Sequence, residues 1–341
     1  ECTIQDVKKS QEISESTRSL NLKSTVLVKS SYKDKIKYAF HMLKQMKEIA
    51  SSKVVVLDTY CIVISLLKHR RSLKIIQMWH SIGTMKKFGY TALDTAEGTS
   101  TKIAKAMRMH EQYSYVFASS PAYQADLAKG FHCPEDIVRI YPLPRVDILT
   151  DASYKQEMRK KLYQKYPILK EKQVILYVPT FRKKETMMQT YVDKLCDALY
   201  DDQILVVKRH PLSKLTIHNP HVLVDTSFTS FDMLFVADAV ISDYSCIIYE
   251  AALLNIPLYF YNFDMQNYTG KRGLAIDYEN ELPGVISKDP KVIIDSIEKE
   301  PYDMDELQRF CKKYVVYDGN TSLHIADFIL NLMKEGNDAH E

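Results

Sequence analysis

The chain has 341 residues, which is enough for two domains of about 150 residues each. A hydrophobic fraction of 46% with 26% charged residues excludes a disordered chain, and a net charge of +3 is too small for a general nucleic-acid binder. The six cysteines occur singly, which excludes a paired zinc motif and a disulfide framework and favours reduced thiols in the cytoplasm.

No membrane span or targeting segment is expected. The longest apolar stretch, residues 54–67, is interrupted by Asp58 and is shorter than the roughly 20 residues that cross a bilayer. A charged leader followed by an apolar core is absent, so no signal peptide is expected. The chain begins at Glu1 without an initiator methionine, which indicates a fragment of a longer protein.

An amphipathic helix is predicted near the start, over residues 33–50. Apolar residues recur there at helical spacing with lysines between them, in the sequence KDKIKYAFHMLKQMKEIA. Such a helix can lie on a membrane surface, or it can pack its apolar stripe on a sheet and expose its lysines. The second interpretation is favoured, because stripes that face a core are far commoner than membrane anchors.

Short apolar runs rich in β-branched residues then alternate with longer amphipathic segments, which predicts parallel sheets covered by helices. The predicted strands lie in residues 53–58, 73–79, 114–119, 173–179, 203–211, 221–225, 238–243 and 257–264. Prolines and a charged helical segment place a linker near residues 142–170, between an N-terminal domain 1–150 and a C-terminal domain 151–341. With only 9 glycines, a glycine-rich dinucleotide fingerprint is absent, which disfavours a nicotinamide or flavin dehydrogenase.

Ligands of open α/β sheets bind beyond the carboxyl ends of the strands, so the residues that follow each run are the candidates. The first polar exit is WHSIG, in which His80, judged by itself, has the pattern of a structural histidine. The second, TFRKK, adds a hydroxyl and a guanidinium at Thr180 and Arg182. The third, KRHP at residues 208–211, is either a pyrophosphate clamp or a solvated run of charge.

The fourth exit, ISDYSCIIYEAALLN, follows a strand and opens a helix. Free backbone amides at a helix start, together with hydroxyls, form an anion site suited to phosphate. Serine and aspartate are also the preferred caps of any helix, so by itself the stretch is explained by capping.

Taken together, WHSIGTMKKFG, YVPTFR, KRHP, ISDYSCIIYEAALLNIPLYFYNFD and the late DGNTS at 318–322 resemble the CDP-glycerol glycerophosphotransferase family, over roughly residues 50–325. The family builds teichoic acids and related polyol-phosphate polymers. The resemblance implies a GT-B fold, in which two Rossmann-like domains face a cleft and the C-terminal domain holds the activated nucleotide.

The resemblance also implies roles for individual residues. His80 would be the general base on the acceptor side, and His210 would contact the donor pyrophosphate. The two catalytic residues implied are therefore His80 and His210. The implied donor-binding set is Thr180, Arg182, Lys208, Arg209, Ser242, Asp243, Ser245 and Glu250, and the acceptor-side set is Trp79, Ser81, Lys86 and Lys87. Ser81 stands where the family commonly has glycine and Glu250 where it commonly has aspartate, which puts the substrate in doubt more than the reaction.

The expected reaction is attack by a hydroxyl on the β-phosphorus of a CDP-activated glycerol or ribitol, with CMP as the leaving group. A histidine suits the base, since its ordinary pKa leaves much of it neutral near pH 7. No cofactor is expected, and no metal, because no Asp-X-Asp pair stands at a strand exit. The expected acceptor is lipid-linked or polymeric, and the enzyme would attach peripherally at the inner face of a bacterial cell membrane, without binding nucleic acid.

Two rival functions stay open. A GT-B glycosyltransferase or sugar-nucleotide epimerase would use the same nucleotide-holding domain with another donor, and Glu250 could then bind the donor ribose. A non-catalytic module could instead bind an anionic polymer through the basic exits.

Overall fold

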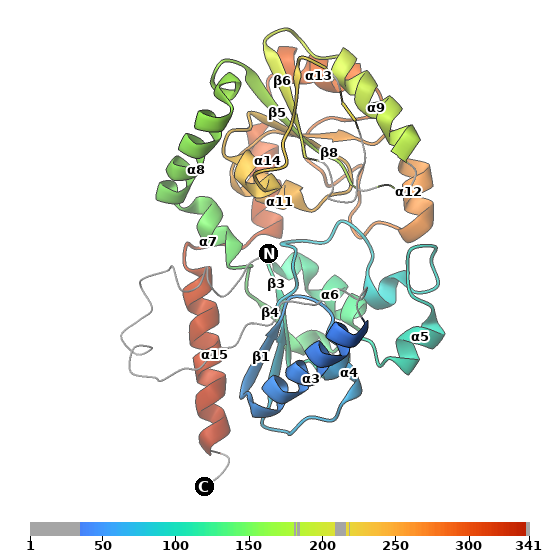
Figure 1. Ribbon diagram of the computed structural model, residues 1–341, viewed down its shortest axis with the longest axis vertical. Coiled ribbons are helices and arrows are strands. Elements are labelled where there is room, and N and C mark those ends of the chain that lie inside the picture. The colour runs from blue at the N-terminus through green and yellow to red at the C-terminus, as the bar shows by residue number, and fades with distance from the viewer. Residues whose placement is uncertain (1–34, 181, 183–184, 209–215, 218, 339–341) are drawn as a thin grey trace. The chain divides into compact units, whose positions relative to one another are not determined.

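A computed structural model describes residues 35–338 apart from 181, 183–184, 209–215 and 218 (Figure 1). The chain divides into two compact units. Unit 1 comprises the residues up to 81, residues 88–147 and the residues from 316 onward, and unit 2 comprises residues 82–87 and 148–315. A single cut at residue 150 therefore lies close to the main boundary at 147, whereas the last helix and the short segment 82–87 each belong with the other part of the chain.

Unit 1 is built on a four-stranded parallel sheet with the order β1-β2-β3-β4. Its strands are β1 (Val54–Leu57), β2 (Lys74–Gln77), β3 (Tyr115–Ala118) and β4 (Val138–Ile140). Its helices are α3 (Lys35–Ser51), α4 (Ile62–Leu66), α5 (Thr101–Ala106), α6 (Gln124–Phe131), the start of α7 (Arg145–Thr150) and α15 (Thr321–Asp338), with 3₁₀ turns at Gly89–Ala92, Pro121–Tyr123 and Glu135–Ile137.

Unit 2 contains a six-stranded parallel sheet with the order β10-β9-β8-β5-β6-β7. Its strands are β5 (Gln173–Val178), β6 (Gln203–Val207), β7 (Val222–Val224), β8 (Ala239–Ser242), β9 (Leu258–Tyr261) and β10 (Ile286–Ser287). Its helices are α8 (Ala152–Lys165), α9 (Glu185–Asp197), α10 (Ser230–Leu234), α11 (Ile247–Leu253), α12 (Met265–Arg272), α13 (Pro290–Lys299) and α14 (Met304–Tyr314), with a 3₁₀ turn at Pro167–Lys170.

The central strands of unit 2 are apolar throughout because both faces of the sheet are covered. All five residues of β6 and all four of β8 are buried, as a parallel sheet with helices on both faces requires. Side chains of β5, β6, β8 and β9 form one core with α9 and α13, including Tyr177, Val192, Leu205 and Ile293. The predicted α/β class with two parallel sheets is confirmed.

The C-terminal helix α15 packs on the sheet of unit 1. Ile325 and Leu332 lie in one buried cluster with Ile76 and Phe117 of strands β2 and β3. The helix begins where the backbone amides of Thr321 and Ser322 donate to the two carboxylate oxygens of Asp147, at 3.1 and 2.7 Å. The late DGNTS stretch thus anchors the start of this helix within unit 1.

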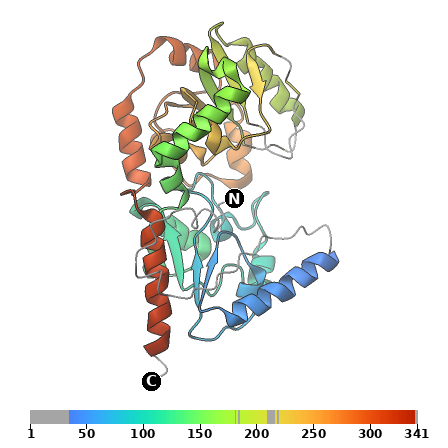
Figure 2. The same cartoon turned by 60° about the vertical axis from the view of Figure 1, so that its left-hand side comes forward.

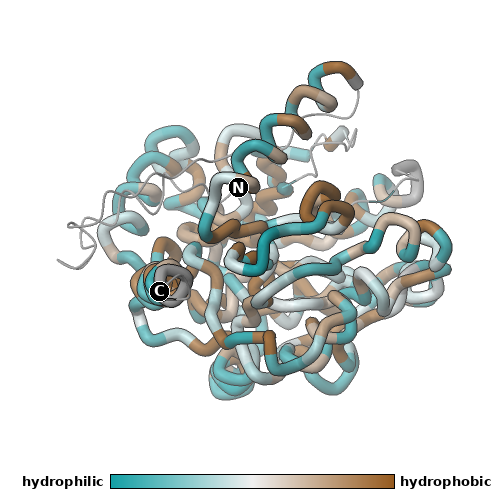
Figure 3. The backbone as a smooth tube through the Cα atoms, turned by 90° about the horizontal axis from the view of Figure 1, so that it is seen from below, coloured by the Kyte–Doolittle hydropathy of each residue, from teal (hydrophilic) through white to brown (hydrophobic). Residues whose placement is uncertain are grey.

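Helix α3 does not pack in the way that the sequence favoured. Its apolar positions Ile36, Phe40, Leu43 and Met46 are 72%, 68%, 59% and 40% exposed, and only Ile49 of the stripe is buried. Figure 2 shows α3 and α15 on different sides of the sheet of unit 1, and apolar and polar segments alternate along the tube of α3 in Figure 3. The interpretation of this stripe as a core face is therefore wrong for most of the helix. Within the described ranges, no helix has both the length and the hydrophobicity of a membrane span.

Candidate functional site

The order of the strands in unit 2 selects one place for a ligand. From the centre of the sheet, β5, β6 and β7 are added in order toward one edge, and β8, β9 and β10 toward the opposite edge. The order of the strands therefore reverses between β5 and β8. In open α/β sheets, ligands bind beyond the carboxyl ends of the strands at this reversal. Thr180 follows β5 and Asp243 follows β8, which puts both at the reversal.

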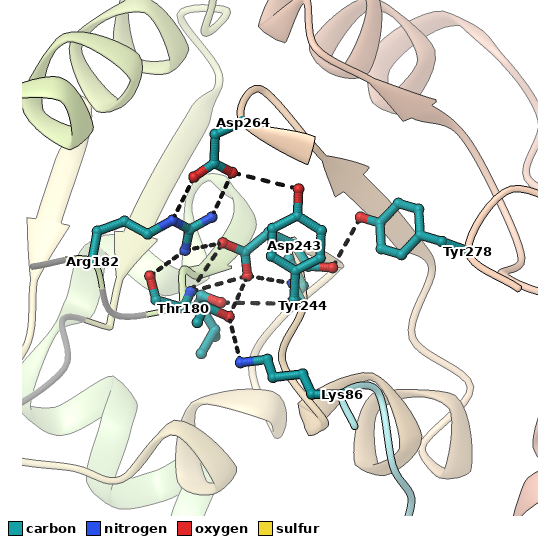
Figure 4. A network of polar contacts seen from close by, with 9 residues as sticks. Lys86, Thr180, Arg182, Asp243, Tyr244, Asp264 and Tyr278 are labelled. Carbon is teal, nitrogen blue, oxygen red and sulfur yellow. Dashed lines mark hydrogen bonds and ion pairs between the residues drawn. The ribbon is translucent and has the colours of Figure 1, made fainter. Parts of the chain in front are cut away.

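Thr180 and Asp243 are hydrogen-bonded to each other there (Figure 4). The backbone amide and hydroxyl of Thr180 donate to the Asp243 carboxylate at 3.0 and 2.7 Å. Arg182 donates from Nη1 to the same carboxylate at 2.7 Å and, through Nε and Nη2, to both oxygens of Asp264 at 2.8 and 2.9 Å. Tyr278 donates its hydroxyl to the backbone carbonyl of Asp243 at 2.9 Å. Two loops that follow different strands, β5 and β8, are thereby joined to a third, which follows β9.

Aromatic rings surround the Arg182 guanidinium. Its central carbon lies 5.5, 5.3 and 5.0 Å from the ring centroids of Tyr244, Phe263 and Tyr268, at cation–π distances. The rings of Tyr244 and Tyr268 are stacked with centroids 4.1 Å apart. Burial alone would lower the pKa of Arg182, but the neighbouring carboxylates outweigh it and raise the pKa above its ordinary value. The cation is therefore permanent.

Most N–H donors of Arg182 are used in hydrogen bonds within the protein. Of the five hydrogens on a guanidinium, one on Nε and one on Nη2 go to Asp264, and Nη1 donates to both Asp243 and the carbonyl of Thr180. The side chain is only 7% exposed. The donors of Arg182 thus hold the loops of this site together, and its expected part in donor binding stays a prediction.

Lys86 supplies a second cation at the margin of this cluster. Its ammonium lies 3.5 Å from the Thr180 hydroxyl and 5.2 Å from the ring centroid of Tyr268. Residues 82–87 belong to unit 2, where Lys86 pairs with Leu274 in an antiparallel bridge and the Lys87 amide donates to the Gly273 carbonyl at 3.3 Å. This backbone pairing holds Lys86 and Lys87 in the unit of the Asp243 cluster, whereas the resemblance implied an acceptor-side role for them.

The remaining residues of the fourth exit differ in accessibility. Ser242 is the last residue of β8, is fully buried, and donates its hydroxyl to the carbonyl of Val178 at 3.5 Å, so it faces the sheet. Ser245 is half-buried in the loop before α11. Glu250 lies within the first turn of α11 and is 2% exposed. Of these three side chains, that of Ser245 is the most accessible to a ligand.

Lys208 does not join the Asp243 cluster. It is 8% exposed, and its ammonium donates to the carboxylate of Asp225 at 2.7 Å, to the Asp225 carbonyl at 3.0 Å and to the Phe228 carbonyl. Burial alone would raise the pKa of Asp225, but hydrogen bonds, with that from Lys208 the largest, lower it to about 2. Because the three hydrogens of its ammonium are used inside the domain, Lys208 is left out of the donor contacts proposed below. Arg209 and His210 of the same exit lie outside the described residues.

The first exit, in unit 1, holds His80 in a defined orientation. Its Nδ1 lies 3.2 Å from the backbone carbonyl of Asp58. Because a carbonyl only accepts, Nδ1 carries the proton in this contact and the lone pair of the neutral ring is on Nε2. Desolvation lowers the pKa of His80 below its ordinary value, the contacts with Asp58 oppose this shift, and the charge of Arg145 adds to it. The ring of Trp79 lies beside that of His80, with centroids 4.1 Å apart. His80 is nevertheless an exposed residue.

The backbone of Trp79 is held in a conformation that is rare for a bulky residue, with a φ of 64°. The side chain of Gln77, which is fully buried, accepts from the Trp79 amide at 2.9 Å and donates to the Thr59 carbonyl and the Tyr113 hydroxyl, each at 3.2 Å. Sequence reasoning missed Gln77, although a glutamine inside the apolar run KIIQMW was a visible sign. Ser81 follows His80, is half-buried, and is the last residue of this part of unit 1.

No group of three or more His, Cys, Asp or Glu side chains in the described part of the chain is placed to hold a metal ion. Asp243 and Asp264, the two carboxylates that meet in unit 2, are bridged by Arg182. A guanidinium thus occupies the position between them.

Comparison with known proteins assigns these features to a family. A family model described as CDP-Glycerol:Poly(glycerophosphate) glycerophosphotransferase matches residues 7–331. The chain is 30% identical over 313 residues to the teichoic acid ribitol-phosphate primase of Bacillus spizizenii, covering 88% of this chain and 80% of that protein. It is 31% identical over 305 residues to the teichoic acid glycerol-phosphate primase of Bacillus subtilis, covering 87% and 78%.

The fold is shared with a solved structure. A variant of the wall teichoic acid polymerase TagF superposes with a TM-score of 0.69 at 20% identity, covering 83% of this chain and 73% of that one. At this identity the likeness concerns the fold, and it confirms the predicted GT-B class.

Proposed function

Since this chain belongs to the CDP-glycerol:poly(glycerophosphate) glycerophosphotransferase family, and so to the CDP-polyol phosphotransferases, we propose that it transfers a polyol phosphate from a CDP-activated polyol to a hydroxyl of a lipid-linked or polymeric acceptor. The acceptor oxygen forms a bond to the β-phosphorus, and the bond from that phosphorus to the bridging oxygen breaks. CMP leaves with the bridging oxygen, and the hydroxyl proton passes to the enzyme.

One observation carries this mechanism, namely the 3.2 Å contact between Nδ1 of His80 and the Asp58 carbonyl. With Nδ1 committed to the Asp58 carbonyl, the lone pair on Nε2 is the part of the ring that can take the proton. A pKa below the ordinary value of 6.5 keeps that lone pair available at neutral pH. His80 is therefore assigned as the general base.

The donor diphosphate is assigned to the margin of the Asp243 cluster. Arg182 and Lys86 together balance the charges of Asp243 and Asp264, so the cluster as a whole adds no net charge. Attraction of a diphosphate then depends on the accessible groups at its edge, of which Lys86 and Ser245 are the described candidates. Arg209 and His210 complete the proposed donor set, with His210 at the pyrophosphate.

Which polyol is transferred is tested by experiment. Two relatives of nearly equal identity are named for different polyols, one for ribitol phosphate and one for glycerol phosphate. The protein is incubated separately with CDP-glycerol and with CDP-ribitol, together with a lipid-linked acceptor, and the products are analysed by mass spectrometry. We expect CMP release and an acceptor heavier by one or more polyol-phosphate units with one of the two donors. Release of UDP from UDP-sugars, with no reaction of either CDP-polyol, would contradict the proposal.

A membrane surface is proposed as the site of this reaction, at the inner face of the cell membrane, with α3 as the attachment. The exposed apolar residues Ile36, Phe40, Leu43 and Met46 share the surface of α3 with the exposed lysines Lys37, Lys44 and Lys47. Apolar side chains flanked by lysines suit the boundary of an anionic bilayer, where each lysine contributes about 1 kcal/mol.

Charge reversal on α3 tests this attachment. The double variant Lys44→Glu/Lys47→Glu is expected to bind phosphatidylglycerol vesicles at least about tenfold more weakly in sedimentation. Lys102→Glu/Lys105→Glu, on exposed positions of α5 in the same unit, makes the same change in net charge and is the control. Equal losses in both double variants, or none in either, would rule out α3 as the membrane contact.

A further inference from the structure

Unit 2 contains a cavity at the edge of its sheet opposite to the Asp243 cluster. Lys172, Asp238 and Pro257 line the cavity and directly precede strands β5, β8 and β9. Thr180 and Asp243 follow β5 and β8 at the other end. Since β5 has six residues that each advance about 3.3 Å, roughly 20 Å separate the two edges. The cavity is therefore no extension of the proposed donor site.

The lining of this cavity, here called the basic cavity, is strongly cationic. Its volume is about 570 Å³, within the range of small-molecule sites. Four cationic side chains and one carboxylate line it, namely Lys155, Arg159, Lys170, Lys172 and Asp238. The carboxylate already accepts the backbone amide of Val174 at 2.8 Å. An anion is thus the ligand that complements the cavity in charge.

Several of these cations gather without a matching acid. Lys155 and Arg159 are four residues apart on α8, where like charges repel. Lys170 and Arg159 both lie over the ring of Tyr163, at 5.4 and 5.7 Å from its centroid. In the part of the chain that the structure describes, none of Lys155, Arg159 and Lys170 forms an ion pair. The repulsion between these groups would be relieved when phosphate groups enter.

Groups that suit hydroxyls lie among the cations. The Tyr163 hydroxyl accepts from Arg159 at 3.1 Å, and the exposed amide of Asn255 forms part of the lining. Two cations lie over the Tyr163 ring and would compete with a nucleotide base for stacking on it. Alternating phosphodiesters and hydroxyls fit this lining better than a nucleotide does.

We infer that the basic cavity binds a segment of polyol-phosphate chain, remote from the reacting end. This inference rests on the proposed function, which supplies such a chain as acceptor and product. A chain held both there and at its reacting end gains affinity through the high effective concentration of the second contact. Long acceptors should therefore bind better than short ones, and short ones should not depend on the cavity.

A matched pair of variants on α8 tests the inference. Lys155→Gln/Arg159→Gln removes two lining cations, and Lys160→Gln/Lys161→Gln removes two cations of the same helix that do not line the cavity. The probe is soluble poly(glycerol phosphate), measured by calorimetry with the full chain. We expect the first variant to bind it about tenfold or more weakly and with a smaller dependence on salt, and the second to bind it as the unchanged protein does.

Kinetics separate this inference from the proposed function. In the lining variant, KM for a long acceptor should rise about tenfold while kcat and the kinetics of a short acceptor stay unchanged. Unaltered polymer binding in the lining variant, or an equal rise of KM for short acceptors, overturns the inference even when transfer from the CDP-polyol is intact. Loss of phosphatidylglycerol vesicle binding with no loss of polymer binding overturns it as well, in favour of a lipid contact. Absence of any transfer by the unchanged protein refutes the proposed function instead.

Discussion

Replacement of Arg182 with methionine is expected to lower the free energy of unfolding by about 3–5 kcal/mol. Methionine fills much of the volume but leaves Asp243 and Asp264, which are 0% and 8% exposed, without their shared counter-ion. Uncompensated carboxylates at these depths are costly, because their charge is desolvated. Urea unfolding measured at neutral pH tests this result.

The loss should shrink under acid conditions. Protonation of the two carboxyls removes the uncompensated charge in the variant, so its deficit relative to the unchanged protein is expected to be smaller at low pH. Asp243→Asn, added to Arg182→Met, should restore part of the stability for the same reason. A variant as stable as the unchanged protein at neutral pH would contradict the role of Arg182 as the link between the three loops.

Lys208→Met is the matched control for the consequences at the site. It breaks a second buried cation–carboxylate pair among the described residues of unit 2, that with Asp225, and should cost similar stability. Its residues lie outside the Asp243 cluster, so at a temperature where both variants are folded, CDP-polyol should bind weakly to Arg182→Met and normally to Lys208→Met. Equal weakening in both variants would mean that the effect comes from stability alone.

The strands were the most predictable part of this fold. Runs such as QVILYV and QILVV are apolar at every position because both faces of a central parallel strand are buried, and this pattern is local. Strands β4 and β10 were missed, since their short sequences VRI and IS each contain a polar residue and form no apolar run. The edge strand β7, with the apolar sequence VLV, was predicted.

The partners of the helices were less predictable. The apolar periodicity of α3 indicated an amphipathic helix but did not say that residues such as Phe40 and Leu43 face outward. Likewise, nothing local in α15 shows that it packs on a sheet formed about 200 residues earlier, because that choice depends on where the chain lies in three dimensions. Periodicity fixes which side of a helix is apolar, and only the fold decides what that side meets.

Side-chain roles at the candidate site were predictable in location and not in detail. The rule for strand exits brought Thr180 and Asp243 together correctly. It did not single out Asp264, although this residue ends the run PLYFYNFD and its carboxylate accepts from Nε and Nη2 of Arg182. Whether a buried cation is available to a ligand or paired with a neighbouring carboxylate depends on distances of about 3 Å, which a sequence does not contain.

Replacement of His80 with glutamine is expected to lower turnover by about 10²–10⁴-fold, the usual contribution of a general base. Glutamine can still donate to the Asp58 carbonyl but cannot accept a proton at neutral pH. Initial rates of CMP release from the CDP-polyol measure the loss. His69→Gln is the control, because His69 also contacts a backbone carbonyl in unit 1, that of Ile64 at 2.9 Å, and should keep its rate.

The pH profile distinguishes a base from a structural histidine at this position. A base acts only when neutral, so kcat/KM should fall as the pH drops through the pKa of His80, which lies below 6.5 because burial and the charge of Arg145 lower it. Arg145→Met removes that charge and should move the acid limb and the NMR titration of His80 to higher pH, whereas Arg145→Lys should leave both nearly in place. Arg145 also donates to the His80 carbonyl at 2.9 Å, so its loss can disturb the turn. A disturbed turn lowers the rate at every pH, and only a titrating base shifts the limb together with its own NMR resonance.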